Sequence, residues 1–136
     1  MINRDKHSLI FPRLWQAIGW FMVAWVVIFS LLPQPPTPPL VTWDKGQHLL
    51  AYVTLMFWFR MAFAPRLYWI SFLVGLGTAL EFLQGWSGYR DFEYADMLAN
   101  STGVMVGLLA AATPLGSLVA QFDRQLTIWM GRWSKG

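Results

Sequence analysis

The amino-acid sequence predicts an all-α protein: an integral membrane four-helix bundle with a C-terminal interfacial amphipathic helix. Hydrophobic residues make up 56% of the chain and charged residues only 12%, against about 25% charged residues in an average soluble domain. Nine tryptophans are present, and tryptophan collects at membrane–water interfaces. Four apolar stretches also approach the roughly 20 residues that a helix needs to cross a bilayer core of about 30 Å.

The length and composition limit what else the protein can be. With 136 residues, the chain is long enough for one ordinary domain and too short for two, so residues 1–136 are interpreted as a single domain. It contains no cysteine, which excludes disulfides, a thiol nucleophile and thiolate metal ligands. Its basic residues are divided among separate segments and form no stripe, so the expected partner is the lipid bilayer and not nucleic acid.

The first two predicted membrane helices lie on either side of a proline-rich segment. The first covers residues 14–32 and ends at "PQPPTPPL", whose prolines cannot continue a helix. Its apolar run is longer than the 7 to 15 residues or so of a signal peptide, and no small-x-small cleavage site precedes the prolines, so we expect it to stay as a helix. The second covers about residues 48–63, with 43–47 extending it.

The third and fourth predicted helices follow at residues 67–86 and 96–112. The third begins after Pro65 and carries a single acid, Glu81. The fourth has small residues at spacing four, which let another helix backbone approach closely; they are Ala99, Gly103, Gly107 and Ala111. We expect this stripe to pack within the chain and not against a second copy, because four helices have internal partners to satisfy first. The oligomeric state is left open.

The last predicted element is an amphipathic helix at residues 114–133. Thr113 can cap it, and Pro114 suits its first turn. Apolar residues recur at three- and four-residue steps, as in an amphipathic helix; they are Leu115, Leu118, Val119, Phe122, Leu126, Trp129, Met130 and Trp133. A helix of this kind is expected to lie on the membrane surface. The alternative is that it packs as a core helix.

The basic residues predict how the bundle is oriented in the membrane. Eight of the ten lie in the N-terminal segment, the turn between the second and third helices, and the tail: Arg4, Lys6, Arg13, Arg60, Arg66, Arg124, Arg132 and Lys135. By the positive-inside rule, both termini are expected to be cytoplasmic. The loops near residues 33–47 and 85–96, which hold Lys45 and Arg90, then face outward.

Polar residues recur at the three helix ends that meet on the outer side. Residues three or four apart share one face of a helix, and such groups are Asp44, His48 and Tyr52, then Glu81 and Gln84, then Asp96 and Asn100. Short loops would bring these ends together. The sequence therefore predicts an outward-facing polar pocket formed by Asp44, Lys45, His48, Tyr52, Glu81, Gln84, Arg90, Asp96 and Asn100.

Most of these residues also have simpler interpretations. These are an interface anchor for Lys45 and Arg90, a helix cap for Asp44, a packed histidine for His48, an interface aromatic for Tyr52, and interhelical hydrogen bonds for Gln84 and Asn100. Glu81 and Asp96 favour a pocket more strongly. A carboxylate at the centre of a membrane helix costs about 2.5–3.5 kcal/mol, and less near an end, so it normally has a counter-ion, hydrogen bonds or a wet cavity. We expect Arg90 to be the counter-ion of these two acids.

Two blocks of the sequence resemble the VanZ-like family. "DKGQHLLAY" is similar to its pattern D-K-x-x-H-x-x-A-Y, and "EFLQGWSGYRDFEYADMLANSTGVMVG" is similar to E-x-x-Q, an arginine, D-x-x-x-N-x-x-G and x-x-x-G. The resemblance covers residues 44–107, the motif core of the domain. The chain departs from the pattern at Leu49, where an aromatic residue is common, and at Leu80, where many relatives have a second acid.

The resemblance implies a small multi-helix protein of the bacterial cytoplasmic (inner) membrane. The namesake of the family is associated with low-level resistance to the lipoglycopeptide teicoplanin. The expected function is that of an accessory protein whose pocket binds an amphiphile, such as a lipoglycopeptide or a lipid-linked envelope precursor.

The alternative is a membrane enzyme that acts on a lipid head group, with His48 as general base. Lys45 and Arg90 would then hold a phosphate-like head group, and a metal-assisted form would use His48, Glu81 and Asp96. No cofactor is assigned from the sequence, and no paired-histidine metal motif is present.

Overall fold

The computed structural model describes residues 9–33, 44–64 and 67–133, and within these ranges every regular element is a helix. The elements are α1 (Pro12–Leu31), α2 (Asp44–Ala62), α3 (Tyr68–Ser87), α4 (Tyr94–Ala111), the short 3-10 helix η2 (Pro114–Ser117) and α5 (Leu118–Trp133). The prediction of an all-α fold is therefore confirmed. Arg4, Lys6, Arg66, Lys135 and most of the proline-rich segment, all of which enter the predictions from sequence, lie outside the described residues.

The helix ends follow local rules of the sequence. Pro12 occupies the first turn of α1, where its missing N–H costs nothing. Gly88 ends α3 with a φ of 73°, a left-handed conformation that suits glycine. The segment predicted as one helix from residue 114 begins instead with η2, and the predicted cap is present, since the Thr113 side chain accepts a hydrogen bond from the backbone N–H of Leu115 at 3.3 Å.

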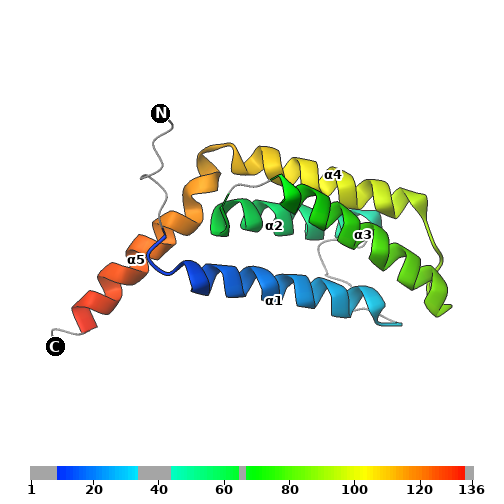
Figure 1. Cartoon of the computed structure of the whole chain (residues 1–136), viewed down its shortest axis with the longest axis horizontal. Coiled ribbons are helices and arrows are strands. Elements are labelled where there is room, and N and C mark those ends of the chain that lie inside the picture. Colours follow the sequence, from blue (N-terminus) through cyan, green and yellow to red (C-terminus); the bar gives the residue numbers. More distant parts are fainter. Residues whose placement is uncertain (1–8, 34–43, 65–66, 134–136) are drawn as a thin grey trace.

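Helices α1 to α4 lie side by side with alternating directions (Figure 1). The most extensive contact joins α2 and α4. A Cβ atom added to Gly103 would lie 2.5 Å from the carbonyl oxygen of Leu49, and one added to Gly107 would press against the carbonyl oxygen of Val53. These two glycines therefore allow α4 to pack closely against α2 within the chain, as expected from the small-residue stripe.

The core of the molecule is centred on α2. Its buried face meets Val23 of α1, Leu73 of α3 and Val104 of α4, and consists of Tyr52, Leu55, Met56 and Phe59. Helix α1 contributes only two buried residues out of 20, Gly19 and Val23. Many of its other apolar side chains are exposed, so α1 lies at the periphery of the helix group.

Helix α5 leaves the direction of α4 through a bend of 77°. Its buried residues are Val119 and Asp123, while Phe122, Trp129 and Trp133 are exposed. The Asp123 carboxylate accepts hydrogen bonds from the backbone N–H groups of Ile10 and Phe11, and so fixes α5 to the start of α1. Packing as a core helix does not describe α5, because its large apolar side chains stay outside the core.

The helices differ in how apolar they are. Of the described helices, α1 alone has the length and hydropathy to cross a membrane. The segments Tyr94–Ala111 and Pro114–Trp133 meet these two criteria only when they are counted together as one span across their bend. A soluble core helix or a signal sequence can have these properties too. Only 11% of the apolar window of α1 is buried, however, whereas a core helix is mostly buried.

Candidate functional site

The predicted polar residues gather at the end of the molecule where α2 and α4 begin and α3 ends. This is the right-hand end in Figure 1, away from α5. It includes the connection between α3 and α4, residues 88–93. The alternating helix directions bring these segments together, although they are far apart in the sequence.

Lys45 connects the start of α2 to the start of α4. Its Nζ contacts Oε2 of Glu93 and lies 3.1 Å from Oδ1 of Asp96, which is buried. Asp96 lies in the first turn of α4, where a carboxylate is also stabilised by the positive end of the helix dipole. Lys45 is therefore an ion-pair partner within the fold and not only an interface anchor.

Arg90 pairs with Asp44, with 3.0 Å between its terminal nitrogen and Oδ1. The expectation that Arg90 is the counter-ion of Asp96 is wrong, because Asp96 forms its ion pair with Lys45. The pair also gives Asp44 a partner 46 positions away, so its role is more than that of a local helix cap. Both basic residues of this end are thus bound to carboxylates.

His48 lies between two polar side chains of α4. Its Nε2 is 3.5 Å from Oδ2 of Asp96, and its Nδ1 is 3.1 Å from Oδ1 of Asn100. The amide of Asn100 can present either its oxygen or its nitrogen to the ring, depending on the histidine tautomer. Asp96 and Asn100 are four residues apart and therefore lie on the same face of α4. Because this face is turned towards His48, each ring nitrogen has a partner.

Glu81 and Tyr52 lie in the interior beneath this network. One oxygen of Glu81 accepts a hydrogen bond from the backbone N–H of Glu93 at 2.8 Å, which ties the α3–α4 connection to α3. The other oxygen of Glu81 and the hydroxyl of Tyr52 are both buried and have no hydrogen-bond partner within the described ranges. Buried polar atoms are nearly always paired, so these two atoms are the place where a water molecule or a ligand group is expected.

Gln84 has a different environment from the other predicted site residues. Its amide nitrogen donates a hydrogen bond to the carbonyl oxygen of Ser30 at 2.7 Å. Ser30 lies in the last turn of α1, where carbonyl groups have no partner in their own helix. Gln84 therefore joins the ends of α3 and α1, as in the simpler interpretation of this residue. Trp86, close by in the sequence, is 87% exposed.

Asp44, His48 and Asp96 form a possible set of metal ligands. One ligand atom from each lies within 4.8 Å of the others. The predicted set had Glu81 in place of Asp44, and the structure groups Asp44 with the other two instead. The two carboxylates are already paired with Arg90 and Lys45. A metal ion would therefore have to compete with two cationic side chains.

Two important acids are not among the predicted site residues. Glu93 has the sequence context of a solvated loop charge, yet it pairs with Lys45; it is the residue that directly precedes α4, in an extended conformation. Asp123 follows Val119 by four and precedes Leu126 by three, so it lies on the apolar face of its helix. A charge on an apolar face is a signal for a buried partner.

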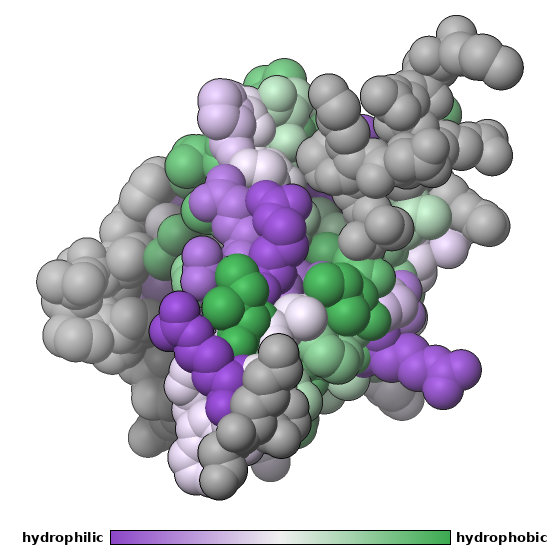
Figure 2. All heavy atoms as spheres, turned by 90° about the vertical axis from the view of Figure 1, so that its left-hand side faces the viewer, coloured by the Kyte–Doolittle hydropathy of each residue, from purple (hydrophilic) through white to green (hydrophobic). Residues whose placement is uncertain are grey.

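The opposite end of the molecule has a different charge. Figure 2, which looks onto the left-hand end of Figure 1, shows hydrophilic residues gathered among hydrophobic ones. The described basic residues of this end include Arg13 at the start of α1, Arg60 near the end of α2 and Arg124 on α5. The acids Asp44, Glu93 and Asp96 are thus separated from most of the described arginines by the length of the helices.

Comparison of the chain with protein-family models finds no match, and comparison with curated proteins and with solved structures finds none either. The resemblance to the VanZ-like family therefore depends on the residues of the two blocks themselves.

Proposed function

We propose that the chain is a VanZ-like protein of the bacterial cytoplasmic membrane, in which α1 to α4 cross the bilayer and the polar residues at one end bind an amphiphile at the outer face. The observation that carries this proposal is the network of Lys45, His48, Asp96 and Asn100, which joins α2 to α4 at one end of the helix group. We call these four residues the polar cluster. The amphiphile is a lipoglycopeptide or a lipid-linked envelope component.

The outward-facing side chains support a membrane location. Large hydrophobic residues are exposed on all the long helices, among them Phe21, Leu50, Phe82, Leu98 and Leu109. Monomeric soluble proteins rarely expose large contiguous apolar surfaces. The four helices have 18 to 20 residues each, which corresponds to about 27–30 Å at 1.5 Å per residue and matches the hydrocarbon core of a bilayer.

The charges and α5 support the proposed orientation. The end that holds Arg13, Arg60 and Arg124 would face the cytoplasm by the positive-inside rule, with both chain termini on that side. If α4 stands upright in the bilayer, the bend of 77° places α5 close to the membrane plane. Its exposed Phe122 and Trp129 can then enter the lipid, as interfacial helices do.

Binding is favoured over catalysis by the state of the charged groups. A general base needs an accessible lone pair within hydrogen-bond reach of a substrate, whereas both ring nitrogens of His48 face side chains of α4. A phosphate-binding role would need available cations, whereas Lys45 and Arg90 are paired with carboxylates. The enzyme alternative rests on one observation, the His48–Asp96 pair, because a carboxylate often orients a catalytic histidine.

The proposal can be tested by antibiotic susceptibility. We expect expression of the wild-type chain in a susceptible Gram-positive host to raise the inhibitory concentration of teicoplanin. Asp96→Asn should abolish the increase, because it breaks the ion pair that joins α2 to α4. His48→Gln should keep part of it, since an amide can replace some contacts of the ring. Thr102→Ala, at an exposed position of α4, is the matched control.

Membrane levels of each variant must be measured by immunoblot. If the wild-type chain gives no increase at a normal level, the proposed function is wrong. If His48→Gln is as inactive as the empty vector at a normal level, while Thr102→Ala is fully active, the enzyme alternative replaces the binding role.

A further inference from the structure

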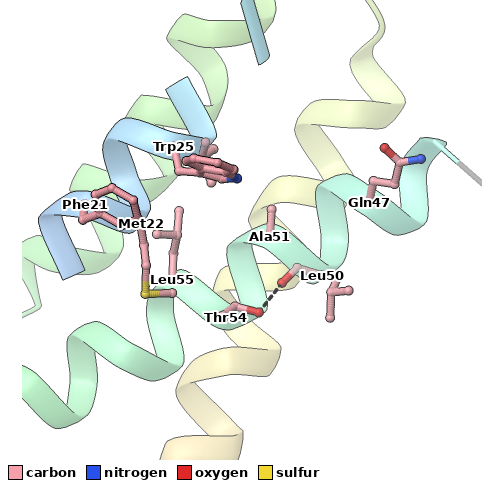
Figure 3. Close-up of a pocket in the computed structure, with 9 residues that line it drawn as sticks. Phe21, Met22, Trp25, Gln47, Leu50, Ala51, Thr54 and Leu55 are labelled. Atoms are coloured by element: carbon pink, nitrogen blue, oxygen red, sulfur yellow. Dashed lines mark hydrogen bonds between the residues drawn. The ribbon is translucent and has the colours of Figure 1, made fainter. Parts of the chain in front are cut away.

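An apolar groove lies between α1 and α2 (Figure 3). Its volume is about 450 Å³. Phe21, Met22 and Trp25 line it from α1, and Leu50, Ala51 and Leu55 line it from α2. All six side chains are hydrocarbon, aromatic or thioether groups, so the groove offers dispersion contacts and no charge to whatever lies in it.

The polarity of the groove changes along its length. Thr54 also lines it, but its hydroxyl donates a hydrogen bond to the carbonyl of Leu50 at 2.8 Å, the dashed line in Figure 3. The hydroxyl is therefore already satisfied within α2. Gln47, whose amide stands at the end of the row of lining residues, directly precedes His48 and is less than one turn from Asp44. The groove is thus apolar over most of its length and polar where it approaches the cluster.

The charge at this polar end is negative. It holds five carboxylates, those of Asp44, Glu81, Asp91, Glu93 and Asp96, and two cations, Lys45 and Arg90. The sequence from Pro33 to Trp43 contains no charged residue and does not change this balance. An anionic head group would meet an excess of like charge, which disfavours binding. A cationic head group would be attracted.

We propose that the groove and the acidic end together bind a single-chain amphiphile with an ammonium head group. The hydrocarbon chain lies between α1 and α2, and the ammonium group meets Asp44, which precedes the lining residue Gln47 by three positions on α2 and has a side chain that is 49% exposed. This inference rests on the proposed function, since it names the class of amphiphile bound there. It differs from the phosphate-type head group considered for the enzyme alternative, whose partners Lys45 and Arg90 are already bound to carboxylates. Asp44 is also paired, but Arg90 contacts its Oδ1, and a carboxylate can accept hydrogen bonds from more than one donor.

The test uses the fluorescence of Trp25, which lines the groove. The full chain is placed in phosphatidylglycerol nanodiscs, whose head groups carry no amine. Two probes with the same bromine-labelled dodecyl chain are added, one with a trimethylammonium and one with a sulfate head group, because bromine quenches tryptophan on contact. A Trp25→Phe variant identifies the share of the quenching that comes from the groove.

We expect the ammonium probe to quench Trp25 at a mole fraction in the bilayer about tenfold lower than the sulfate probe needs. Ala51→Phe should remove this quenching for both probes by filling the groove. Asp44→Asn should reduce the preference for ammonium. Asp91→Asn makes the same charge change in the exposed α3–α4 connection and should leave the preference close to that of the wild type.

Two outcomes would overturn the proposal. Equal quenching by the two probes would show that the acidic end does not select the head group, and an equal effect of Asp44→Asn and Asp91→Asn would show that the ammonium group does not meet Asp44. Quenching of Trp25 that is unchanged by Ala51→Phe would show that the chain does not lie in the groove. The antibiotic measurement with the His48 and Asp96 variants uses no probe, so the proposed function and this inference can fail separately.

Discussion

The carboxylate of Asp123 on α5 accepts a hydrogen bond from the indole Nε1 of Trp15 on α1, at 2.7 Å. The two residues are 108 positions apart, and the same carboxylate also accepts the backbone N–H groups of Ile10 and Phe11. An acid from the far end of the chain therefore fixes the segment that leads into α1, whose first helical residue is Pro12. The three donors explain why a charged residue lies on the apolar face of α5.

The first prediction concerns this contact. Asp123→Ala should lower the free energy of unfolding by about 1–3 kcal/mol, because it leaves the backbone donors of Ile10 and Phe11 and the indole N–H of Trp15 without their acceptor in a partly buried place. Gln125→Ala, at an exposed position two residues further along α5, is the control and should change stability little. Unfolding in mixed micelles, followed by far-ultraviolet circular dichroism, measures both. Equal stability of the Asp123→Ala variant and the wild type would show that these hydrogen bonds do not hold α5 to the start of the chain's first helix.

The second prediction is the pH dependence of the same contact. Burial alone would raise the pKa of the Asp123 carboxyl, but the hydrogen bonds from Trp15, Ile10 and Phe11 outweigh it and lower the pKa. A group whose pKa is lower in the folded state contributes its full stability above its unfolded pKa, about 3.9 for aspartate. That contribution is lost as the pH falls through the lower, folded value.

The stability difference between the wild type and Asp123→Asn should therefore be constant from neutral pH to about pH 5 and should shrink in more acidic solution. Unfolding curves of both proteins at a series of pH values measure this difference. A difference that shrinks instead as the pH rises above about 5 would have the wrong sign for a carboxyl group with a lowered pKa.

The third prediction concerns the close approach of α2 and α4. Gly107→Ala should destabilise the fold by about 1–3 kcal/mol, because the added methyl group meets the backbone of α2 at Val53. Gly75→Ala is a matched control, since a Cβ atom there has no neighbour within 4 Å. It should be neutral or stabilising by up to about 1 kcal/mol, because alanine favours helices. Equal effects of the two substitutions in an unfolding titration would mean that α2 and α4 are not in close contact at Gly107.

The fourth prediction separates two roles of Glu81. Glu81→Gln keeps a carbonyl oxygen that can accept the N–H of Glu93, whereas Glu81→Ala removes it. We expect the alanine variant to be less stable than the glutamine variant by about 1 kcal/mol. Limited proteolysis of the α3–α4 connection should also be faster in the alanine variant. If both variants are equally stable and equally resistant, this hydrogen bond does not hold the connection in place.

The fifth prediction concerns topology, and the absence of native cysteine makes it direct to test. A cysteine at Ser87, at the acidic end, should react with a membrane-impermeant maleimide in intact cells. A cysteine at Gln121 on α5 should react only after permeabilisation. Both positions are exposed in the fold, so burial within the protein does not prevent labelling. The opposite pattern would reverse the proposed orientation.

Much of the candidate site could be predicted from local spacing. Residues four apart on one helix share a face, and this spacing alone places His48 beside Asp44 and Asp96 beside Asn100. Which basic residue meets which acid could not be predicted in this way. The pairing depends on which side chains can reach each other once the helices are packed. Lys45 pairs with Asp96 across the α2–α4 contact, and Arg90 pairs with Asp44.

The helical class and the approximate extent of each helix could be predicted from the sequence, because apolar length, prolines and small-residue spacing act over a few neighbouring residues. The glycines at 103 and 107 also indicated which face of α4 another helix could approach closely. The contacts between distant segments could not be predicted in this way; examples are Asp123 with Trp15, Gln84 with Ser30, and the groove between α1 and α2. These contacts arise from how whole helices are placed relative to one another, and periodicity within a single helix carries no information about that placement.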